Sequence, residues 1–392
     1  MRGHIRKRGD SWAIVLDVGR NPATGRRQQK WHSGYRTQRE AQRALPELLS
    51  KLNKGTYVST NRLTVAEYLR EWLAGARVDL RDSTLPGYEI AVEKHLVPGV
   101  GHYRLQDLRP HHLTAFYAEL LRSGHRQREG GLSPRTVRFV HSVLRRALQD
   151  AVESRLLDAN PADAKAVRPP AAKTAKEAAR KKRRTWTAEE LGRFLDSLGD
   201  NSLRAAFHLA AMTGMRRGEV LGLRWRDLDL DAGRLRVVQT LVAPRYVLTV
   251  SEPKTDHGRR SIDLDEGTVA VLRAHRKRQT QDQLALGAGY QPSELVFRNA
   301  DGSPVVPHLF SLAFKRAVKR AGLPPCRLHD LRHTHATLLA MSGEHPKVVQ
   351  ERLGHHSPGF TLETYTDAFP SQQREAARRF AALVAGTGDG TR

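Results

Sequence analysis

The sequence predicts a multidomain protein: a small β-sheet plus helix at the N-terminus, an all-α second domain, and an α+β third domain that is mainly α with a small antiparallel sheet. A chain of 392 residues exceeds what one hydrophobic core usually holds. Apolar residues alternate at period two near the N-terminus and recur at helical spacing over most of the remaining chain. A basic, Pro-containing stretch, residues 161–185, is typical of a linker and separates the third domain from the first two.

Residues 1–58 form the first predicted domain. Apolar side chains alternate along SWAIVLDV, residues 11–18, and NPATGRR then supplies a turn before QQKWHS. This pattern predicts a short hairpin. Thr37 and Glu40 have the spacing of a capping box, which predicts the start of a helix, and Pro46 is expected to kink or restart that helix.

Residues 62–160 are expected to be all helical. Thr64 and Glu67 form a second capping box, and Ser133 with Pro134 is typical of another helix start. The apolar stripe of this later helix consists of Val137, Val140, Leu144, Ala147, Leu148 and Ala151.

Basic residues point to a polyanionic partner. Lys and Arg number 66 against 41 Asp and Glu, a formal net charge of +25, and nucleic acid rewards many such contacts by releasing counterions. The candidate DNA-binding residues are Arg135 and Arg138 in the second domain and Lys181, Lys182, Arg183 and Arg184 in the linker. A solvated basic face and a plain flexible tether explain the same residues about equally well.

The single cysteine, Cys326, excludes an internal disulfide and suits a cytoplasmic protein, in which it would be a small buried side chain. No stretch of about 18 apolar residues occurs, so we expect no membrane partner.

Residues 186–392 form the third predicted domain. Helical patterns dominate, but residues 235–264 contain three strand-like stretches, LRVVQTLV, YVLTV and RRSIDL. Residues 254–258 are expected to be the hairpin turn between the last two strands.

The stretch LHDLRHTHAT, residues 328–337, raises the question of a metal site. His329 and His333 are four residues apart, as in the zinc-binding pattern H-E-x-x-H, but Asp330 stands where that pattern has Glu. Arg332 lies on the same helical face and would repel a divalent cation while attracting an anion. Phosphate therefore fits this face better than zinc, although a zinc site and a bland helical surface remain alternatives.

Five motifs follow one another in the third domain: TGMRRGEVLGLRW at 213–225, EPKTDHGRR at 252–260, HDLRH at 329–333, LGHH at 353–356 and TLETYTD at 361–367. In this order and spacing they resemble the tyrosine recombinase, or phage integrase, family. The resemblance implies that the third domain is catalytic, and that the first two are an arm-type DNA-binding domain and a core-binding domain.

Six positions match the residues that act on one phosphate in this family: Arg216, Lys254, His329, Arg332, His355 and Tyr365. The resemblance implies that Glu219 and His333 support them.

The chemistry of phosphoryl transfer accounts for these residue types. Two guanidiniums can clamp the charged oxygens of the transition state, so that Arg216 and Arg332 replace a metal ion. Tyr365 would be the nucleophile, His329 its proton acceptor, and Lys254 the proton donor to the leaving 5′ oxygen. His355 would hydrogen bond to a nonbridging oxygen.

The expected function is site-specific DNA recombination through a 3′-phosphotyrosyl intermediate and a Holliday junction, which integrates and excises a mobile element such as a phage. The enzyme would need no metal, cofactor or ATP. Its expected partners are double-stranded DNA with attachment sites and three further copies in a homotetramer on synapsed DNA, and a host DNA-bending protein or an excision factor would also suit the family. Three alternatives stay open: a chromosome-dimer resolvase of the same family, a DNA-binding regulator that does not cleave, and a zinc hydrolase.

Overall fold

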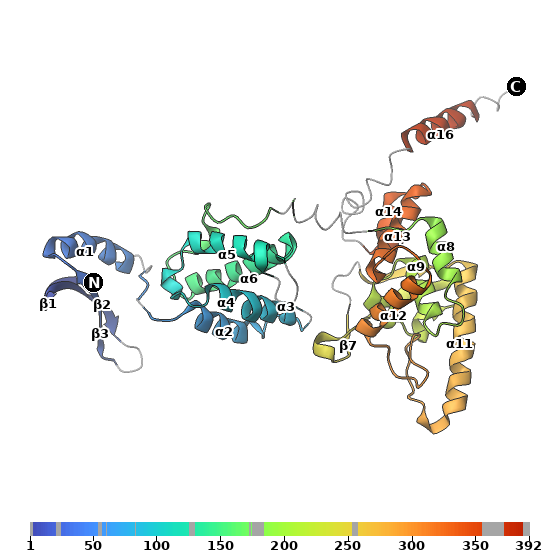
Figure 1. Ribbon diagram of the computed structural model, residues 1–392, viewed down its shortest axis with the longest axis horizontal. Coiled ribbons are helices and arrows are strands. Elements are labelled where there is room, and N and C mark those ends of the chain that lie inside the picture. The colour runs from blue at the N-terminus through green and yellow to red at the C-terminus, as the bar shows by residue number, and fades with distance from the viewer. Residues whose placement is uncertain are drawn as a thin grey trace. The chain divides into compact units, whose positions relative to one another are not determined.

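The structure is a computed structural model that describes residues 3–20, 25–53, 57–59, 61–82, 84–124, 130–171, 174, 184–252, 258–354 and 372–386. The chain divides into two compact units, residues 1–180 and 181–392, which are described separately (Figure 1).

The N-terminal part of the first unit is a three-stranded antiparallel sheet with one helix. The strands β1 (Gly3–Arg8), β2 (Ser11–Arg20) and β3 (Arg27–Tyr35) pair in that order, and α1 (Gln38–Asn53) lies across one face (Figure 1). The predicted hairpin is β2 with β3. The sequence did not predict β1, because GHIRKR contains a single aliphatic residue.

The capping box at the start of α1 is confirmed, since the Glu40 amide donates to Thr37 Oγ1 at 3.2 Å and the Thr37 amide to Glu40 Oε2 at 3.4 Å. The expected restart of the helix at Pro46 is wrong, because α1 continues through that residue, whereas the expected kink stays a prediction. Leu45 and Leu48 flank the proline and pack against the core of the sheet, which offsets the missing hydrogen bond.

The rest of the first unit is helical, as predicted. Its elements are α2 (Val65–Ala76), α3 (Leu85–Glu89), a π-helical stretch (Ile90–Leu96), α4 (Val97–Val100), α5 (Pro110–Ser123), α6 (Pro134–Glu153) and short 3-10 turns at Leu105–Asp107 and Pro161–Asp163. Both predicted helix starts are confirmed: Thr64 and Glu67 form a capping box on α2, and Ser133 accepts from the Thr136 amide on α6.

The predicted apolar stripe of α6 is buried in full within the helical core. Ala162 and Val167 are buried in the same core, and Arg138 Nη1 donates to Pro170 O at 3.1 Å. Residues 161–170 therefore pack on the helices, and the predicted linker begins later than residue 161.

The second unit contains two small antiparallel sheets. One consists of β4 (Leu228–Asp229), β5 (Arg234–Val237) and β8 (Arg260–Asp263) in that order, and the other of β6 (Thr240–Val242) and β7 (Thr249–Ser251). Because β7 and β8 belong to different sheets, the expected hairpin between these two strands is wrong. Alternating burial alone cannot choose a strand's partner, and the stretch predicted as one strand, LRVVQTLV, is divided between both sheets.

Helices form most of the second unit, which confirms the predicted fold class. They are α8 (Ala188–Asp196), α9 (Arg204–Thr213), α10 (Arg217–Leu221), α11 (Glu266–Leu286), α12 (Pro307–Arg320), α13 (Leu328–Met341), α14 (Pro346–Leu353) and α16 (Gln372–Gly386), with 3-10 turns at Trp225–Asp227, Pro244–Tyr246 and Gly287–Gly289. Four aromatic side chains, Trp186, Phe194, Phe207 and Phe314, pack together in the core. Among the described residues, no helix is long and apolar enough to cross a membrane.

Candidate active site

Arg216 occupies a helix start that a glycine turn creates. Helix α9 ends at Thr213, and Gly214 follows in the left-handed conformation with φ of 64°. A Cβ atom there would lie 2.6 Å from the Leu353 side chain and 2.9 Å from that of His335, so only glycine fits. The chain then reverses, and Arg216 becomes the N-cap of α10.

The guanidinium of Arg216 makes two hydrogen bonds within the protein and stays partly open to solvent. Its Nη1 donates to Glu219 Oε1 at 2.7 Å and its Nη2 to Gly354 O at 3.2 Å, while 42% of the side chain is exposed. The backbone N–H of Arg216 also donates to Glu219 Oε2, at 2.8 Å. Glu219 thus contacts Arg216, as expected for a supporting residue.

Glu219 is buried between two arginines. Besides Arg216 it accepts from Arg260, whose Nη2 lies 2.8 Å from Oε2 and whose Nη1 lies 3.2 Å from Oε1. Burial alone would raise the pKa of Glu219, but the Arg260 and Arg216 cations outweigh burial and lower it to about 2. Glu219 is therefore a permanent anion that aligns both cations.

Arg332 lies on α13, which packs against α9, and only 4% of the residue is exposed. Its Nη1 donates to Gly214 O at 2.8 Å and its Nη2 to Leu353 O at 2.6 Å. The turn after α9 and the end of α14 thus fix this guanidinium from two sides.

Three successive carbonyls at the C-terminus of α14 accept from three arginines. Arg352 O accepts from Arg260 Nε at 2.7 Å, the Leu353 carbonyl accepts from Arg332, and the Gly354 carbonyl accepts from Arg216. Carbonyls in the last turn of a helix lack partners within the helix and carry the negative end of its dipole. The helix end therefore gathers the predicted catalytic arginines immediately before residue 355.

His329 lies in the first turn of α13. The His329 and His333 rings pack edge to face with centroids 5.3 Å apart. His329 is exposed on the surface of α13. Even so, partial desolvation of its ring, and then the Arg332 cation, lower its pKa. A neutral imidazole is thus favoured at this position.

His335 lies on the same helix but away from this group. It is buried, accepts from Arg352 Nε at 3.2 Å, and has its pKa lowered to about 3 by burial first and by Arg352 second. His335 is therefore a packed helix histidine outside the group of predicted site residues.

Several predicted residues lie outside the described part of the chain. These are Lys254, His355, Tyr365, Lys181, Lys182 and Arg183. Among the described candidates for DNA binding, Arg135 and Arg138 are exposed on α6, and Arg184 lies 3.5 Å from Glu190.

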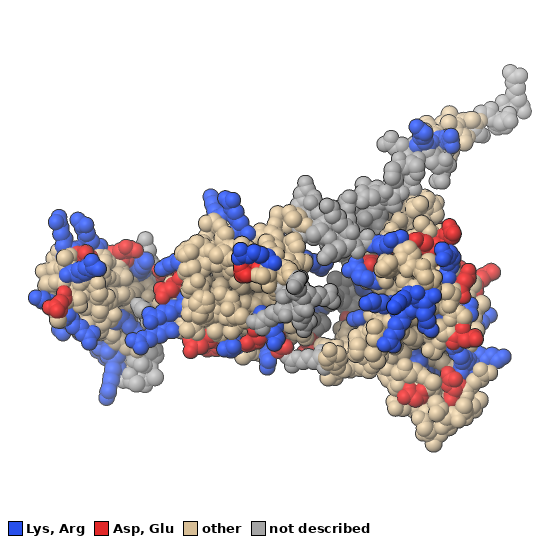
Figure 2. Space-filling model, in the orientation of Figure 1, with Lys and Arg blue, Asp and Glu red and all other residues tan. Residues whose placement is uncertain are grey.

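Each of the two units has a further basic surface. On α12 the side chains of Lys315, Arg316, Lys319 and Arg320 are exposed, and Figure 2 shows Lys and Arg gathered over this part of the second unit. On α6 a pocket of about 470 Å³ is lined by Arg138, Arg145 and Arg146 among others.

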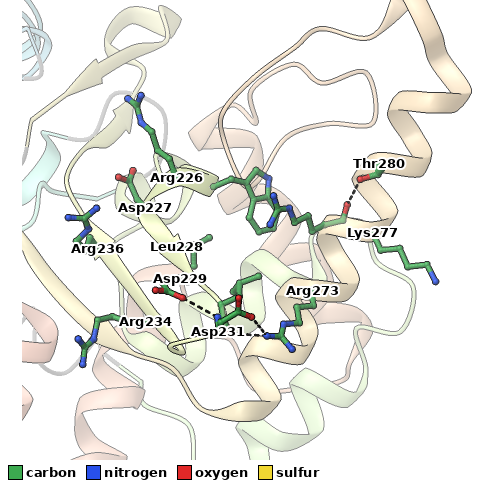
Figure 3. Close-up of a pocket in the computed structure, with 13 residues that line it drawn as sticks. Arg226, Asp227, Leu228, Asp229, Asp231, Arg234, Arg236, Arg273, Lys277 and Thr280 are labelled. Carbon is green, nitrogen blue, oxygen red and sulfur yellow. Dashed lines mark hydrogen bonds and ion pairs between the residues drawn. The ribbon is translucent and has the colours of Figure 1, made fainter.

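A pocket of about 790 Å³ lies between β5 and α11, and none of the predicted site residues lines it. Figure 3 shows Arg234 and Arg236 on one side and Arg273 and Lys277 on the other. Arg273 binds Asp231 at 2.6 Å and Arg234 binds Asp263 at 2.7 Å, so nearby carboxylates neutralise two of these cations. The charges of this pocket are therefore partly compensated.

Sequence reasoning missed Arg260, although a signal was present. In the strand RSID, Arg260 and the core residue Ile262 are two positions apart and so point to the same side of the strand. An arginine on the buried side of a strand needs a buried carboxylate, which Glu219 supplies. In the described residues, no group of three or more His, Cys, Asp and Glu side chains is arranged to hold a metal ion.

Three regions of the chain match known families. Residues 184–372 match the phage integrase family, residues 4–52 an arm DNA-binding domain, and residues 64–121 the N-terminal SAM-like domain of phage integrases.

Similar proteins span the chain. A XerC-like tyrosine recombinase of Caldanaerobacter subterraneus is 27% identical, over 95% of this chain and 96% of its own. The ICEBs1 integrase of Bacillus subtilis is 25% identical, over 95% and 97%. The crystal structure of a lambda integrase tetramer bound to a Holliday junction has a similar fold, with a TM-score of 0.57 and 20% identity over 93% of this chain and 95% of that one.

Two arginines meet at the end of α14, the motifs around them follow the family's order, and three regions of the chain match family models. The chain therefore belongs to the phage integrase family of tyrosine-type site-specific recombinases.

Proposed function

We propose that this protein cleaves and rejoins DNA at specific sites through a 3′-phosphotyrosyl intermediate and so integrates and excises a mobile element. The observation that carries this proposal is the convergence of Arg216 and Arg332 on the end of α14, directly before the segment with His355 and Tyr365. The matched arm domain and the similarity to the integrase of an integrative element favour integration over the resolution of chromosome dimers.

The two arginines would both bind the scissile phosphate, although the protein holds them differently. Arg332 is buried and hydrogen bonded on two sides, whereas the Arg216 side chain is partly exposed to solvent. Each guanidinium can donate two parallel hydrogen bonds to nonbridging oxygens, and such bonds strengthen as negative charge builds in the transition state. The clamp then supplies the positive charge that a metal ion supplies in other phosphoryl-transfer enzymes.

Proton transfers would accompany the displacement. The phenolic oxygen of Tyr365 attacks phosphorus, the bond from phosphorus to the 5′ oxygen breaks, and the phenolic proton moves to His329. The lowered pKa of His329 keeps its ring neutral near pH 7, which is the form that accepts a proton. Lys254 would protonate the departing 5′ oxygen, and His355 would donate to a nonbridging oxygen. The tyrosine ester retains the bond energy, so religation needs no ATP.

DNA binding would use basic surfaces outside the cleavage site. We assign this role to the arginines of α6, the exposed basic residues of α12 and the linker cations, because phosphate contacts of this kind hold a duplex in register without reading its sequence. We further propose a homotetramer on two synapsed duplexes, as the lambda integrase forms on a Holliday junction. A host bending protein or an excision factor would complete the assembly.

The test is the variant Tyr365→Phe on a nicked half-site DNA in buffer with EDTA. The wild type should form a covalent adduct at Tyr365 despite the chelator, while the variant should bind the DNA equally well and form none, because only the nucleophilic oxygen is lost. Mass spectrometry of the adduct identifies the tyrosine. An adduct on another tyrosine, or cleavage that EDTA stops and zinc restores, would refute the proposed mechanism.

A further inference from the structure

Arg260 lies inside the site, and its guanidinium donates four hydrogen bonds within the protein. Only 7% of its side chain is exposed, and all three guanidinium nitrogens already donate within the protein. Nε binds Arg352 O, Nη2 binds Glu219, and Nη1 binds both Glu219 and Gly258 O. The proposed reaction gives this residue no task.

The first consequence of this geometry concerns Arg216. The Glu219 carboxylate is shared, because Oε1 accepts from Arg216 and from Arg260, and Oε2 accepts from the Arg216 amide and from Arg260. Arg216 has a long, partly exposed side chain that would otherwise adopt many rotamers. Without Arg260, the carboxylate would keep only its two hydrogen bonds from Arg216, so the direction of the Arg216 guanidinium would be less firmly fixed.

The second consequence concerns the end of α14. Arg260 Nε holds the Arg352 carbonyl at 2.7 Å, and the two carbonyls after it bind Arg332 and Arg216. A shift of the first carbonyl would be passed to the next two, since they belong to consecutive peptide units. Arg260 therefore acts on Arg216 through both Glu219 and the end of α14, and on Arg332 through the end of α14.

We propose that Arg260 is a positioning residue for DNA strand cleavage, which orients the Arg216 and Arg332 clamp through the Glu219 carboxylate and the last turn of α14. This inference rests on the proposed function and adds to it a residue that never meets the substrate. Misplacement of a catalytic group by about 1 Å can cost roughly 100-fold in rate, so loss of Arg260 should mainly slow the chemical step.

The first experiment measures single-turnover cleavage of a nicked half-site at saturating protein, together with the Kd for that DNA. Arg260→Gln should cleave roughly 10- to 100-fold more slowly, with a Kd changed less than about threefold because the phosphate contacts of the surface remain. Arg260→Lys should be intermediate, because an ammonium keeps the charge beside Glu219 but cannot also reach Arg352 O.

A matched control separates positioning from stability. Arg224 also makes a bidentate pair with a buried carboxylate, donating to Asp227 at 2.6 and 3.1 Å, but these bonds involve none of the site residues. Arg224→Gln should lower the melting temperature as Arg260→Gln does, yet cleave at the wild-type rate below that temperature. If both variants slow cleavage equally, or neither does, the positioning role is wrong.

A second substrate tests whether Arg260 acts through the clamp. A methylphosphonate at the cleavage position lacks the negative charge that the guanidiniums neutralise, so the defect of Arg260→Gln should shrink on this substrate, as should that of Arg216→Ala. An equal defect on both substrates would overturn the inference. Failure of the wild type to form any adduct at Tyr365 would instead refute the proposed function.

Discussion

The buried histidine His335 makes the stability of the second unit depend on pH. In the folded protein burial and Arg352 lower its pKa to about 3, whereas an unfolded histidine has a pKa near 6.5. Between these values the unfolded chain binds a proton that the folded chain does not. The free energy of unfolding therefore falls as the pH falls through this window, by about 1.4 kcal/mol per pH unit from this residue.

His335→Gln should remove this pH dependence while its amide oxygen still accepts from Arg352. Between pH 7.5 and pH 5 the wild type should lose about 2 kcal/mol more unfolding free energy than the variant, because only the wild type carries the titrating ring. Urea unfolding of both proteins at the two pH values measures the difference. Equal losses would show that folding does not lower the pKa of His335.

Single residues also show what the sequence could predict about the site. Arg216 and Arg332 were identifiable because each sits in a short motif of fixed order, and the structure brings both to α14. Arg260 ends the motif EPKTDHGRR but was missed, since its partner Glu219 is 41 positions away in the chain and adjacent only after folding. A motif records residues that are close in sequence, whereas a supporting ion pair is fixed by tertiary packing.

At the scale of elements, local signals predicted the helices better than the strands. Capping boxes at Thr37, Thr64 and the cap at Ser133 are contacts within four residues, so the sequence contains them entirely. The partner of a strand is set by long-range pairing instead. For this reason β1 was missed and β8 was assigned to β7 when it pairs with β5.

The turn from α9 to α10 gives a prediction at this scale. Gly214→Ala should lower the free energy of unfolding by about 1–3 kcal/mol, because alanine is strained at positive φ. Its Cβ would also meet the Leu353 and His335 side chains. Cleavage should slow as well, since Arg332 binds the carbonyl of this residue.

Gly192→Ala is the control for that substitution. Gly192 lies inside α8 with no atom within 4 Å of an added Cβ, so alanine there should stabilise the protein by about 0.4–1 kcal/mol. Urea denaturation compares the two variants. A neutral or stabilising effect of Gly214→Ala would mean that the turn relaxes without cost, and that the glycine is not needed to place Arg216.

At the scale of the whole molecule, the net charge of +25 agrees with a protein that binds a long polyanion, and it was readable from composition alone. Composition says nothing about how copies of the chain meet. The C-terminal helix α16 indicates where such a contact would form, because apolar side chains recur along it at helical spacing. Phe380, Leu383 and Val384 are 72%, 70% and 56% exposed.

We predict that this stripe joins protomers in the proposed tetramer, so that replacing it should separate DNA binding from assembly. The triple variant Phe380→Ser, Leu383→Ser, Val384→Ser should bind a half-site as a monomer with unchanged Kd, because the DNA-binding surfaces assigned to α6 and α12 are intact. It should lose cooperative assembly and Holliday-junction formation, because three exposed apolar side chains would no longer be buried against a neighbour.

The opposite face of α16 supplies the control. Arg374 and Arg378 are exposed there, and replacing both with Gln keeps the apolar stripe while removing charge. This double variant should still assemble, as native gels and analytical ultracentrifugation on synapsed half-sites would show. If the triple variant also assembled and recombined normally, the stripe would serve packing within its own protomer.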